Sequence, residues 1–467
     1  MNTGDLKKLG VPDGDALKLA VAHMCRRFAR GLDRSAVAAE LAAIVGTPSA
    51  FLGDATVAPL ARALLRPAFT PRARPAPWRQ WGDGLEPEAV SQMARACSLP
   101  VAVAGALMPD AHVGYGLPIG GVLATDNAVI PYAVGVDIAC RMRLSVFDCP
   151  AARIPGMRDR LANTLERETR FGVGCSFTPR REHAVMDDDW TVSPVTKRLR
   201  DKAWGQLGTS GSGNHFVEFG AFTVAPEPAA ELGLSAGVHL ALLSHSGSRG
   251  TGAQVCEMYS ARAMAKHDDL PKELRQLAWL SLDDADGQEY WAAMSLMGRY
   301  AAANHELIHR HITRALGEKV TLEVENHHNF AWRERHVVDG VEREVVVHRK
   351  GATPAGVGTY GIIPGSMATP GYVVRGKGDR DSLHSASHGA GRAMSRSKAL
   401  QSFTWSAVRK RLAEAGVDLL SAGLDEAPGV YKDIEAVMAA QTDLVDTLGR
   451  FDPKLVKMCP TGEKAED

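Results

Sequence analysis

The chain has 467 residues, of which 45% are apolar and 23% charged, an ordinary composition for a globular protein with a large core. Lys plus Arg equals Asp plus Glu at 54 each, which excludes nucleic-acid binding through overall charge and leaves only a local patch. Without a signal peptide or an apolar run of about 18 residues, and with an odd number of scattered cysteines, we expect a cytoplasmic protein with reduced thiols and no membrane partner.

Residues 1–77 are predicted to form a helical N-terminal extension that ends in a linker. Apolar residues recur at helical spacing in DALKLAVAHMCRRFARGL and in DRSAVAAELAAIV, where Asp33 is placed to cap the second helix. The segment 67–77, PAFTPRARPAP, is too rich in proline for a helix and should be extended. Up to Gln80 the chain carries 12 Lys or Arg against 6 Asp or Glu, an excess that is more often solvated than bound to nucleic acid.

Residues 78–467 are predicted to form a second domain of the α+β class, because short β-rich runs there alternate with glycine and with fewer helices. Buried strands are expected at 128–136, 240–244, 320–324 and 345–348. The segment 181–193 is expected to be an exposed loop. Asp339-Gly340 indicates a protruding hairpin, since this dipeptide tolerates the positive φ angles of a tight turn.

A long helix is predicted at 288–316, and it contains His305-Glu306-Leu307-Ile308-His309, a match to the zinc-peptidase pattern H-E-x-x-H. Two histidines on one helical face could hold zinc, with Glu306 as general base. No third helical ligand is nearby, and so short a pattern arises by chance in a chain with 16 histidines. The simpler interpretation is a polar helix face with a partly exposed histidine pair, and the peptidase remains a remote alternative.

Four glycine-rich segments carry side chains that bind metals. In VGVDIAC, Asp137 and Cys140 stand three residues apart, where the expected strand 128–136 ends. Three further segments each bring an imidazole to a turn or strand end, which is how a rigid sheet assembles a metal site. Their histidines are His215, His245 and one of His327 or His328. Five ligands suit two ions bridged by the Cys140 thiolate, and ligand softness alone favours zinc over manganese.

A fifth segment, SASHGAGR, places His388 directly before a flexible turn. The basic residues around it are Arg375, Lys377, Arg380, Arg392, Arg396 and Lys398. Only Asp379 and Asp381 oppose them, so the sequence predicts a local basic patch. With no other base beside it, His388 is expected to be a nucleophile or an acid/base group acting on a phosphorylated substrate.

Eight motifs in this order resemble those of the RtcB-type RNA ligases, which join a 3′-phosphate or 2′,3′-cyclic phosphate to a 5′-hydroxyl. Between about Trp78 and Met458 they are MPDAHVGYG, VGVDIAC, GSGNHFVE, HSGSRG, HHN, IPGSM, SHGAGRAMS and EAPGVYK. The resemblance implies stacked mixed β-sheets flanked by helices, with the N-terminal helices as an addition. It also implies two Mn²⁺ ions in place of zinc, GTP as cofactor, RNA as partner and a helper protein of the archease type, while the oligomeric state stays open.

Carried over residue by residue, the resemblance assigns Asp137, Cys140 and His215 to one ion and Cys140, His245 and His328 to the other. His388 would attack the α-phosphate of GTP, form a histidine–GMP intermediate and pass GMP to the RNA 3′-phosphate. The RNA(3′)pp(5′)G end would then be sealed by the 5′-hydroxyl. The implied nucleotide contacts are Asn214, His215, Phe216, Val217, Glu218, His328, Asn329, Pro364, Gly365, Ser366, Met367, His388, Gly389, Ala390, Gly391, Tyr431 and Lys457.

Three features depart from the family pattern. Arg141 follows the bridging cysteine, where glycine is common, and it is expected to add bulk and charge next to the metals. Gly371 stands where a serine is usual, which would remove one polar contact to the nucleotide. The chain ends in KLVKMCPTGEKAED, whereas family members usually end in Lys-Gly, so the match of Lys457 to the family's terminal lysine is inexact. A second alternative is therefore a guanylyltransferase that caps 3′-phosphate ends without sealing them efficiently.

Overall fold

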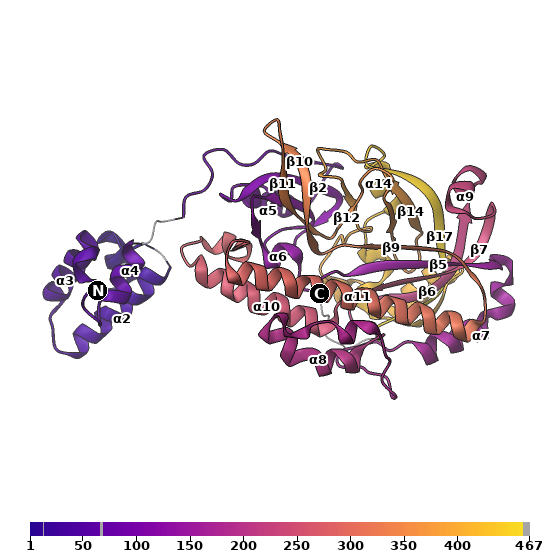
Figure 1. Cartoon of the computed structure of the whole chain (residues 1–467), viewed down its shortest axis with the longest axis horizontal. Coiled ribbons are helices and arrows are strands. Elements are labelled where there is room, and N and C mark those ends of the chain that lie inside the picture. The colour runs from indigo at the N-terminus through magenta and orange to yellow at the C-terminus, as the bar shows by residue number, and fades with distance from the viewer. Residues whose placement is uncertain (13, 66–68, 461–467) are drawn as a thin grey trace.

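The computed structural model describes residues 1–12, 14–65 and 69–460, so the predicted linker residues Pro67 and Ala68 lie outside the described residues. The N-terminal helices form a bundle that stands beside the main body (Figure 1) and has its own core of Leu6, Val37, Leu41 and Ile44, among others. Asp33 accepts a hydrogen bond from the N–H of Ala36, which confirms the predicted N-cap. The helices are α1 (Thr3–Lys8), α2 (Asp15–Ala29), α3 (Arg34–Gly46), the 3-10 helix η1 (Pro48–Phe51) and α4 (Ala58–Leu65).

The described part of the linker, 69–77, forms no helix or strand, and it runs along the main body. The N–H of Arg72 donates to the backbone oxygen of Ser98 at 3.0 Å, and that of Ala76 donates to Cys97 at 2.7 Å. This segment leads directly into the first strand, which begins at Trp78.

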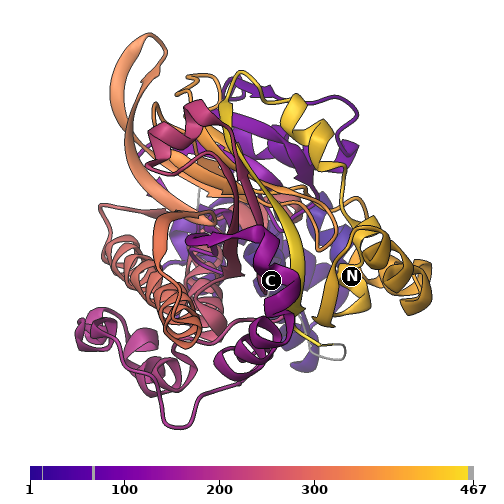
Figure 2. The ribbon, with the colours of Figure 1, turned by 90° about the vertical axis from the view of Figure 1, so that its right-hand side faces the viewer.

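The main body contains a five-stranded sheet with the strand order β1-β2-β3-β11-β10. The predicted hairpin is confirmed, because Asp339 and Gly340 have φ angles of 51° and 78° and connect the last two strands. It projects from the body in both views (Figures 1 and 2). The strands are β1 (Trp78–Gln80), β2 (Ala102–His112), β3 (Ile119–Thr125), β10 (Phe330–Val338) and β11 (Val341–Lys350).

A larger, eight-stranded sheet follows the order β13-β14-β17-β6-β7-β5-β9, with β16 paired to β17. It curls until its two ends nearly meet, where the side-chain amide of Asn326 on β9 accepts from the N–H of Ile362 on β13 at 2.9 Å. Its inner face packs Leu144, Phe222 and Phe451. The strands are β5 (Arg141–Pro150), β6 (Phe216–Val224), β7 (Gly237–Ser246), β9 (Val320–His327), β13 (Tyr360–Ile363), β14 (Gly371–Gly376), β16 (Asp418–Ser421) and β17 (Val445–Met458).

Two short strand pairs complete the sheets. One joins β12 (Ala352–Pro354) to β15 (Ser385–Ser387), and the other joins β4 (Ala128–Val129) to β8 (Leu280–Ser281). Because β12 follows β11 and β15 immediately precedes His388, the first pair attaches the segment with the predicted nucleophile to the five-stranded sheet.

Helices cover the outer faces of the sheets, which confirms the predicted α+β organisation. The predicted long helix is confirmed as α11, which starts three residues earlier than expected and ends at Leu316, as predicted. The next residue, Gly317, caps it in a left-handed conformation that glycine adopts easily. Among the described residues, no helix combines the length and apolarity needed to span a bilayer. The helices of the main body are α5 (Pro87–Cys97), α6 (Pro131–Val134), α7 (Ile154–Glu168), α8 (Pro194–Gln206), α9 (Pro226–Leu232), α10 (Arg249–Lys266), α11 (Ala285–Leu316), α12 (Arg396–Ser402), α13 (Trp405–Glu414) and α14 (Ile434–Ala439).

Two predicted elements are wrong. The expected strand at 128–136 is strand only at Ala128–Val129, because Pro131 begins the short helix α6, and proline favours the first turn of a helix. The expected exposed loop at 181–193 contains two 3-10 helices that bury Val185, Met186 and Trp190 against the main core.

Candidate metal and nucleotide site

The predicted metal ligands and most of the predicted nucleotide contacts line one cavity of about 750 Å³. It lies where the end of the eight-stranded sheet meets the five-stranded sheet and the segment that contains His388. The predicted positions that line it come from seven separate segments of the chain, and only two of the predicted positions fall outside the lining.

Adjacent strands bring the metal-ligating side chains to the same edge of the eight-stranded sheet. His215 comes directly before β6, His245 is the penultimate residue of β7, Cys140 directly precedes β5, and His328 directly follows β9. Phe216 and Met142 are both in register with His245, so the three central strands end at the same level. Since neighbouring strands lie about 5 Å apart, side chains at these ends reach one another.

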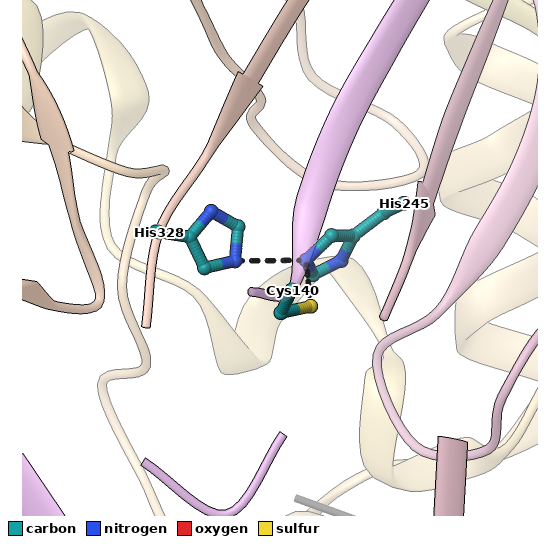
Figure 3. Close-up of side chains that lie close together, drawn as sticks. All are labelled: Cys140, His245 and His328. Carbon is teal, nitrogen blue, oxygen red and sulfur yellow. Dashed lines mark hydrogen bonds between the residues drawn. The ribbon is translucent and has the colours of Figure 1, made fainter. Parts of the chain in front are cut away.

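The ligand atoms form two groups that share Cys140. One is Asp137, Cys140 and His215, and the other is Cys140, His245 and His328. The Cys140 Sγ lies 3.4 Å from His215 Nε2 and 3.1 Å from His245 Nε2. Figure 3 shows the second group, in which His245 Nε2 lies 3.2 Å from His328 Nε2. In the first group, His215 Nε2 lies 3.1 Å from Asp137 Oδ2.

This donor set fits divalent ions. Burial lowers the pKa of His245 to about 3 and that of His328 well below its ordinary value, so both imidazoles are neutral. The Nε2 atoms of the two rings lie 3.2 Å apart, and two neutral imidazoles can place at most one proton between them. Lone pairs that point toward the same position are well placed to bind a cation. Nitrogen, sulfur and carboxylate oxygen are the donors that transition metals take.

The carboxylate of Asp137 is oriented by its surroundings. Its Oδ1 accepts from the N–H of Ser248 at 2.9 Å, which leaves Oδ2 turned toward His215. Burial opposes ionisation, but the contact with His215 holds the pKa of Asp137 below its ordinary value. A Cβ at position 247 would lie 2.0 Å from this carboxylate, so only glycine permits the arrangement.

His388 is paired with Asp110, a partner that the sequence analysis missed. The expectation that no base stands beside His388 is therefore wrong. His388 Nδ1 lies 2.7 Å from Asp110 Oδ2, and its backbone N–H donates to the same oxygen at 3.2 Å. The His388 ring also lies 4.9 Å from the ring of His328, next to the metal-ligating group. Because Nδ1 donates to the carboxylate, the lone pair lies on Nε2.

Glu218 gives the cavity a second buried carboxyl group. Burial raises the pKa of Glu218 well above its ordinary value. Nearby, the turn after β13 is closed by Thr369, whose Oγ1 accepts from the N–H of Ser366 at 2.7 Å. Phe216 and Tyr431 line the same cavity and supply aromatic surface.

Val217 and Lys457 do not line the cavity, although both were predicted nucleotide contacts. Successive side chains of a strand point to opposite faces, so the cavity receives the neighbours of these residues. Val217 packs in a core with Leu161 on the outer face. The Nζ of Lys457 donates to Glu166 Oε2 at 2.7 Å, on the side of α7.

The same alternation directs Arg141 away from the metal-ligating group. Its guanidinium pairs with Glu325 and donates to the backbone oxygen of Gly298 on α11 at 3.4 Å. The expectation that Arg141 adds bulk next to the metals is therefore wrong, although its charge still acts on Cys140. Gly371 lines the cavity, and a Cβ there would lie 3.3 Å from the Cα of Pro364.

The predicted basic patch is largely neutralised. Arg392 and Arg396 both pair with buried Glu426, and Arg375 and Lys377 both pair with an acidic residue of β17. Of the six basic residues, only Arg392 and Arg396 line the cavity. In the folded chain, acidic residues from other segments therefore reduce the local excess of positive charge that the sequence predicted.

The H-E-x-x-H histidines are buried, so the expectation of a partly exposed pair is wrong. Ser244 Oγ lies 2.8 Å from His305 Nδ1 and 2.9 Å from His309 Nε2. The remaining ring nitrogens contact oxygens of β7 and β5 at 3.0 and 2.7 Å. Glu306 points outward, where it pairs with His183. Since every ring nitrogen has a partner and the glutamate lies on another face, the pair attaches α11 to the sheet and does not form a zinc site.

Together, the fold and the site define an α+β protein with two candidate metal-ligating groups next to a histidine that is oriented by a carboxylate. The chain belongs to the tRNA-splicing ligase RtcB family, whose model matches residues 92–458. It is 34% identical to the RNA-splicing ligase RtcB of Mycobacterium tuberculosis, over 78% of this chain and 98% of that protein. It is 31% identical to the RNA-splicing ligase RtcB of Escherichia coli K12 (80% and 95%) and 32% identical to the tRNA-splicing ligase RtcB of Archaeoglobus fulgidus (78% and 88%).

Proposed function

We propose that this member of the RtcB family is a GTP- and Mn²⁺-dependent ligase that joins RNA 3′-phosphate or 2′,3′-cyclic phosphate ends to 5′-hydroxyl ends. The observation that carries the proposal is the pairing of His388 with Asp110 inside the cavity that also contains both metal-ligating groups. This geometry leaves the Nε2 of a neutral imidazole available for bond formation with phosphorus.

Two groups of side chains would hold the ions. Asp137, Cys140 and His215 would bind one and Cys140, His245 and His328 the other, with the Cys140 thiolate between them. When bound, divalent ions would offset the negative charge that grows on phosphate oxygens during the reaction. The choice of manganese over zinc follows the family resemblance, because the donor set by itself favours zinc.

His388 would act as the nucleophile in the first step. Its Nε2 attacks the α-phosphorus of GTP, the bond to the β-phosphate oxygen breaks, and pyrophosphate leaves. The ring then carries a positive charge, which the Asp110 carboxylate stabilises through Nδ1–H. This partnership both selects the correct tautomer and lowers the energy of the product.

Two further transfers would complete the ligation. An oxygen of the RNA 3′-phosphate attacks the phosphorus of the bound GMP, and the N–P bond to His388 breaks to give RNA(3′)pp(5′)G. The 5′-hydroxyl of the second strand then attacks the RNA 3′-phosphorus, and GMP leaves. A 2′,3′-cyclic end must first take up water, because the second step needs a free 3′-phosphate.

The guanine would bind on the side of Glu218. Burial raises the pKa of this carboxyl group, and hydrogen bonds from the two N–H groups of the Watson–Crick edge would favour its ionised form. Tyr431 and Phe216 would provide apolar surface for the ring. The phosphates would lie among the remaining predicted contacts that line the cavity, which are Asn214, His215, His328, Asn329, Pro364 to Met367 and Gly389 to Gly391. Val217 and Lys457 are not part of this proposal, because they face the other side of the sheet.

The test is GMP labelling of the protein with α-labelled GTP and Mn²⁺. The wild type should acquire an acid-labile, alkali-stable label, as expected for a phosphoramidate. His388→Ala should acquire none, and His239→Ala, which removes a histidine outside the cavity, should label as the wild type does. A label that survives in His388→Ala would contradict the assignment of the nucleophile.

A second stage separates ligation from capping. Labelled protein is mixed with one RNA that ends in a 3′-phosphate and another that begins with a 5′-hydroxyl. Joined RNA supports the ligase, whereas accumulation of RNA(3′)pp(5′)G without joining supports the guanylyltransferase that only caps ends.

A further inference from the structure

The predicted nucleotide contacts account for only part of the cavity. They come chiefly from the eight-stranded sheet and from the segment that contains His388. Another part of the lining lies beside the five-stranded sheet. It includes His112 and Lys350 from strands β2 and β11, Glu86 before α5, and the turn 113–115. This part has no role in the proposed binding of GTP, and the ligation needs room for a second molecule, the RNA.

Tyr115 presents an exposed aromatic ring in that part of the cavity. Its side chain is 61% exposed, and the neighbouring Val113 is 41% exposed, although both line the cavity. A ligand that enters the cavity can therefore cover both of these side chains. The backbone below it is held, since the N–H of Val113 donates to Glu86 Oε2 at 3.1 Å.

Further contacts hold the turn that contains Tyr115 on both sides. The side-chain amide of Gln92 accepts from the N–H of Gly114 at 3.0 Å and donates to its oxygen at 2.6 Å. The Nζ of Lys350 donates to the backbone oxygen of Tyr115. The ring is therefore exposed on a fixed backbone, and a ligand that binds it does not have to order the turn first.

Tyr115 is connected to His388 by a short path. Lys350 contacts the backbone of Tyr115 and is followed by Gly351, where a Cβ would lie 3.2 Å from His388 Cε1. The RNA end must bring its 3′-phosphate to the phosphorus carried by His388. A nucleotide close to that end therefore passes near Tyr115.

We propose that Tyr115 is a stacking platform for a nucleobase next to the reacting end of the RNA, an inference that rests on the proposed function. A nucleobase fits this surface better than a phosphate does, because the exposed ring carries no positive charge. Every base has a flat aromatic face, so stacking holds the RNA end without selecting its sequence. The platform thus raises affinity for broken ends of different sequence.

The test compares Tyr115→Ala with Tyr115→Phe, which keeps the ring. Tyr360→Ala is the matched control, because Tyr360 lies on β13 and does not line the cavity. Initial rates of joining are measured against RNA concentration. By the usual contribution of one stacked base, Tyr115→Ala should raise the KM for RNA by about 10-fold or more with little change in kcat. Tyr115→Phe and Tyr360→Ala should stay close to the wild type.

A fluorescence measurement identifies the base that stacks. 2-Aminopurine is placed either at the last position of the 3′-phosphate strand or at the first position of the 5′-hydroxyl strand. Binding to the wild type and to Tyr115→Phe should quench one of these probes, and binding to Tyr115→Ala should not. Quenching that is equal in all three proteins, or absent from the wild type, would overturn the platform.

GMP labelling of each variant distinguishes a failure of the proposed function from a failure of the Tyr115 platform. If the wild type acquires no label, the proposed function fails, and the platform fails with it. If the wild type labels and joins RNA while Tyr115→Ala shows an unchanged KM, only the platform is overturned. Melting temperatures check that each variant is folded, which is expected of changes at an exposed side chain.

Discussion

Replacement of Asp110 by asparagine should slow the transfer of GMP to His388 much more than it weakens GTP binding. Asp110 is fully buried, and its Oδ2 accepts from both the ring and the backbone of His388. Burial alone would raise the pKa of Asp110, but the hydrogen bond and the charge of His388 hold that pKa below its ordinary value. The carboxylate is therefore ionised when the His388 ring becomes positive.

The size of the effect follows from the strength of that contact. A hydrogen bond to a charged group contributes ~1.5–3 kcal/mol, against ~0.5–1.5 kcal/mol for a neutral pair. Loss of the charge on Asp110 thus costs about 1–2 kcal/mol, which slows labelling by about 5- to 30-fold. If the new amide turns its NH₂ group toward Nδ1, the wrong tautomer forms and the loss approaches ~10⁴-fold, as in the Asp→Asn change of serine-protease triads.

The assay is single-turnover GMP labelling at saturating GTP and Mn²⁺, with the GTP dissociation constant measured separately. Asp433→Asn is a matched control, because Asp433 caps α14 outside the cavity and asparagine caps a helix equally well. Labelling of a folded Asp110→Asn variant at the wild-type rate would refute the role of this pair. So would a rate loss explained entirely by weaker GTP binding.

Four further outcomes are expected. Cys140→Ala should remove both ions, because Cys140 belongs to both ligand groups, and metal analysis after dialysis checks this. His305→Ala should lower the free energy of unfolding by about 1–3 kcal/mol in urea, since it removes two buried hydrogen bonds, while GMP labelling persists; lost labelling at unchanged stability would support the zinc alternative. Burial lowers the pKa of Lys350 to about 8 from 10.5, so between these pH values the unfolded chain binds more protons. The free energy of unfolding should therefore rise with pH across that window, by up to about 3 kcal/mol, and Lys350→Met should flatten the rise. Deletion of residues 1–65 should leave the melting transition and GMP labelling of the remainder intact, because the core of the bundle contains no residue of the main body.

The grouping of the candidate metal ligands could be predicted because each has a local signal. Cys140, His215, His245 and His328 each stand at one end of a β-rich run, and these runs are neighbouring strands of one sheet. The long helix and the hairpin could be predicted for the same reason, since periodicity and turn residues act over a few positions. Such signals do not depend on how distant segments pair.

Asp110 could not be assigned as the partner of His388, because nothing close to it in the sequence indicates the pairing. The two residues are separated by 278 positions, and they meet only because β2 and β15 lie side by side in the folded chain. The prediction of a basic patch was wrong for a related reason, because the residues that neutralise the patch are distant from it in the sequence. Charges that cluster in sequence were neutralised by Glu426 and by an acidic residue of β17, which sequence proximity did not reveal.

Strand alternation explains the remaining errors. A motif identifies a stretch of chain, whereas the two-residue period of a strand decides which members of the stretch reach the cavity. Val217 and Lys457 were assigned to the site by the family resemblance, and Arg141 by its position next to Cys140. Each lies on the opposite face from an adjacent site residue. A prediction that had first placed these positions on strands would have separated them correctly.

The two faces of β7 connect the rejected zinc motif with the metal-ligating group. His245 turns toward Cys140 and His328, while the preceding Ser244 turns toward α11 and binds both histidines of the H-E-x-x-H match. Because α11 is thereby fixed to the strand one residue before the ligand, His305 and His309 limit the sliding of β7 that would move His245. The histidine pair therefore contributes to the geometry of the metal-ligating group without contacting it, through the strand that both faces share.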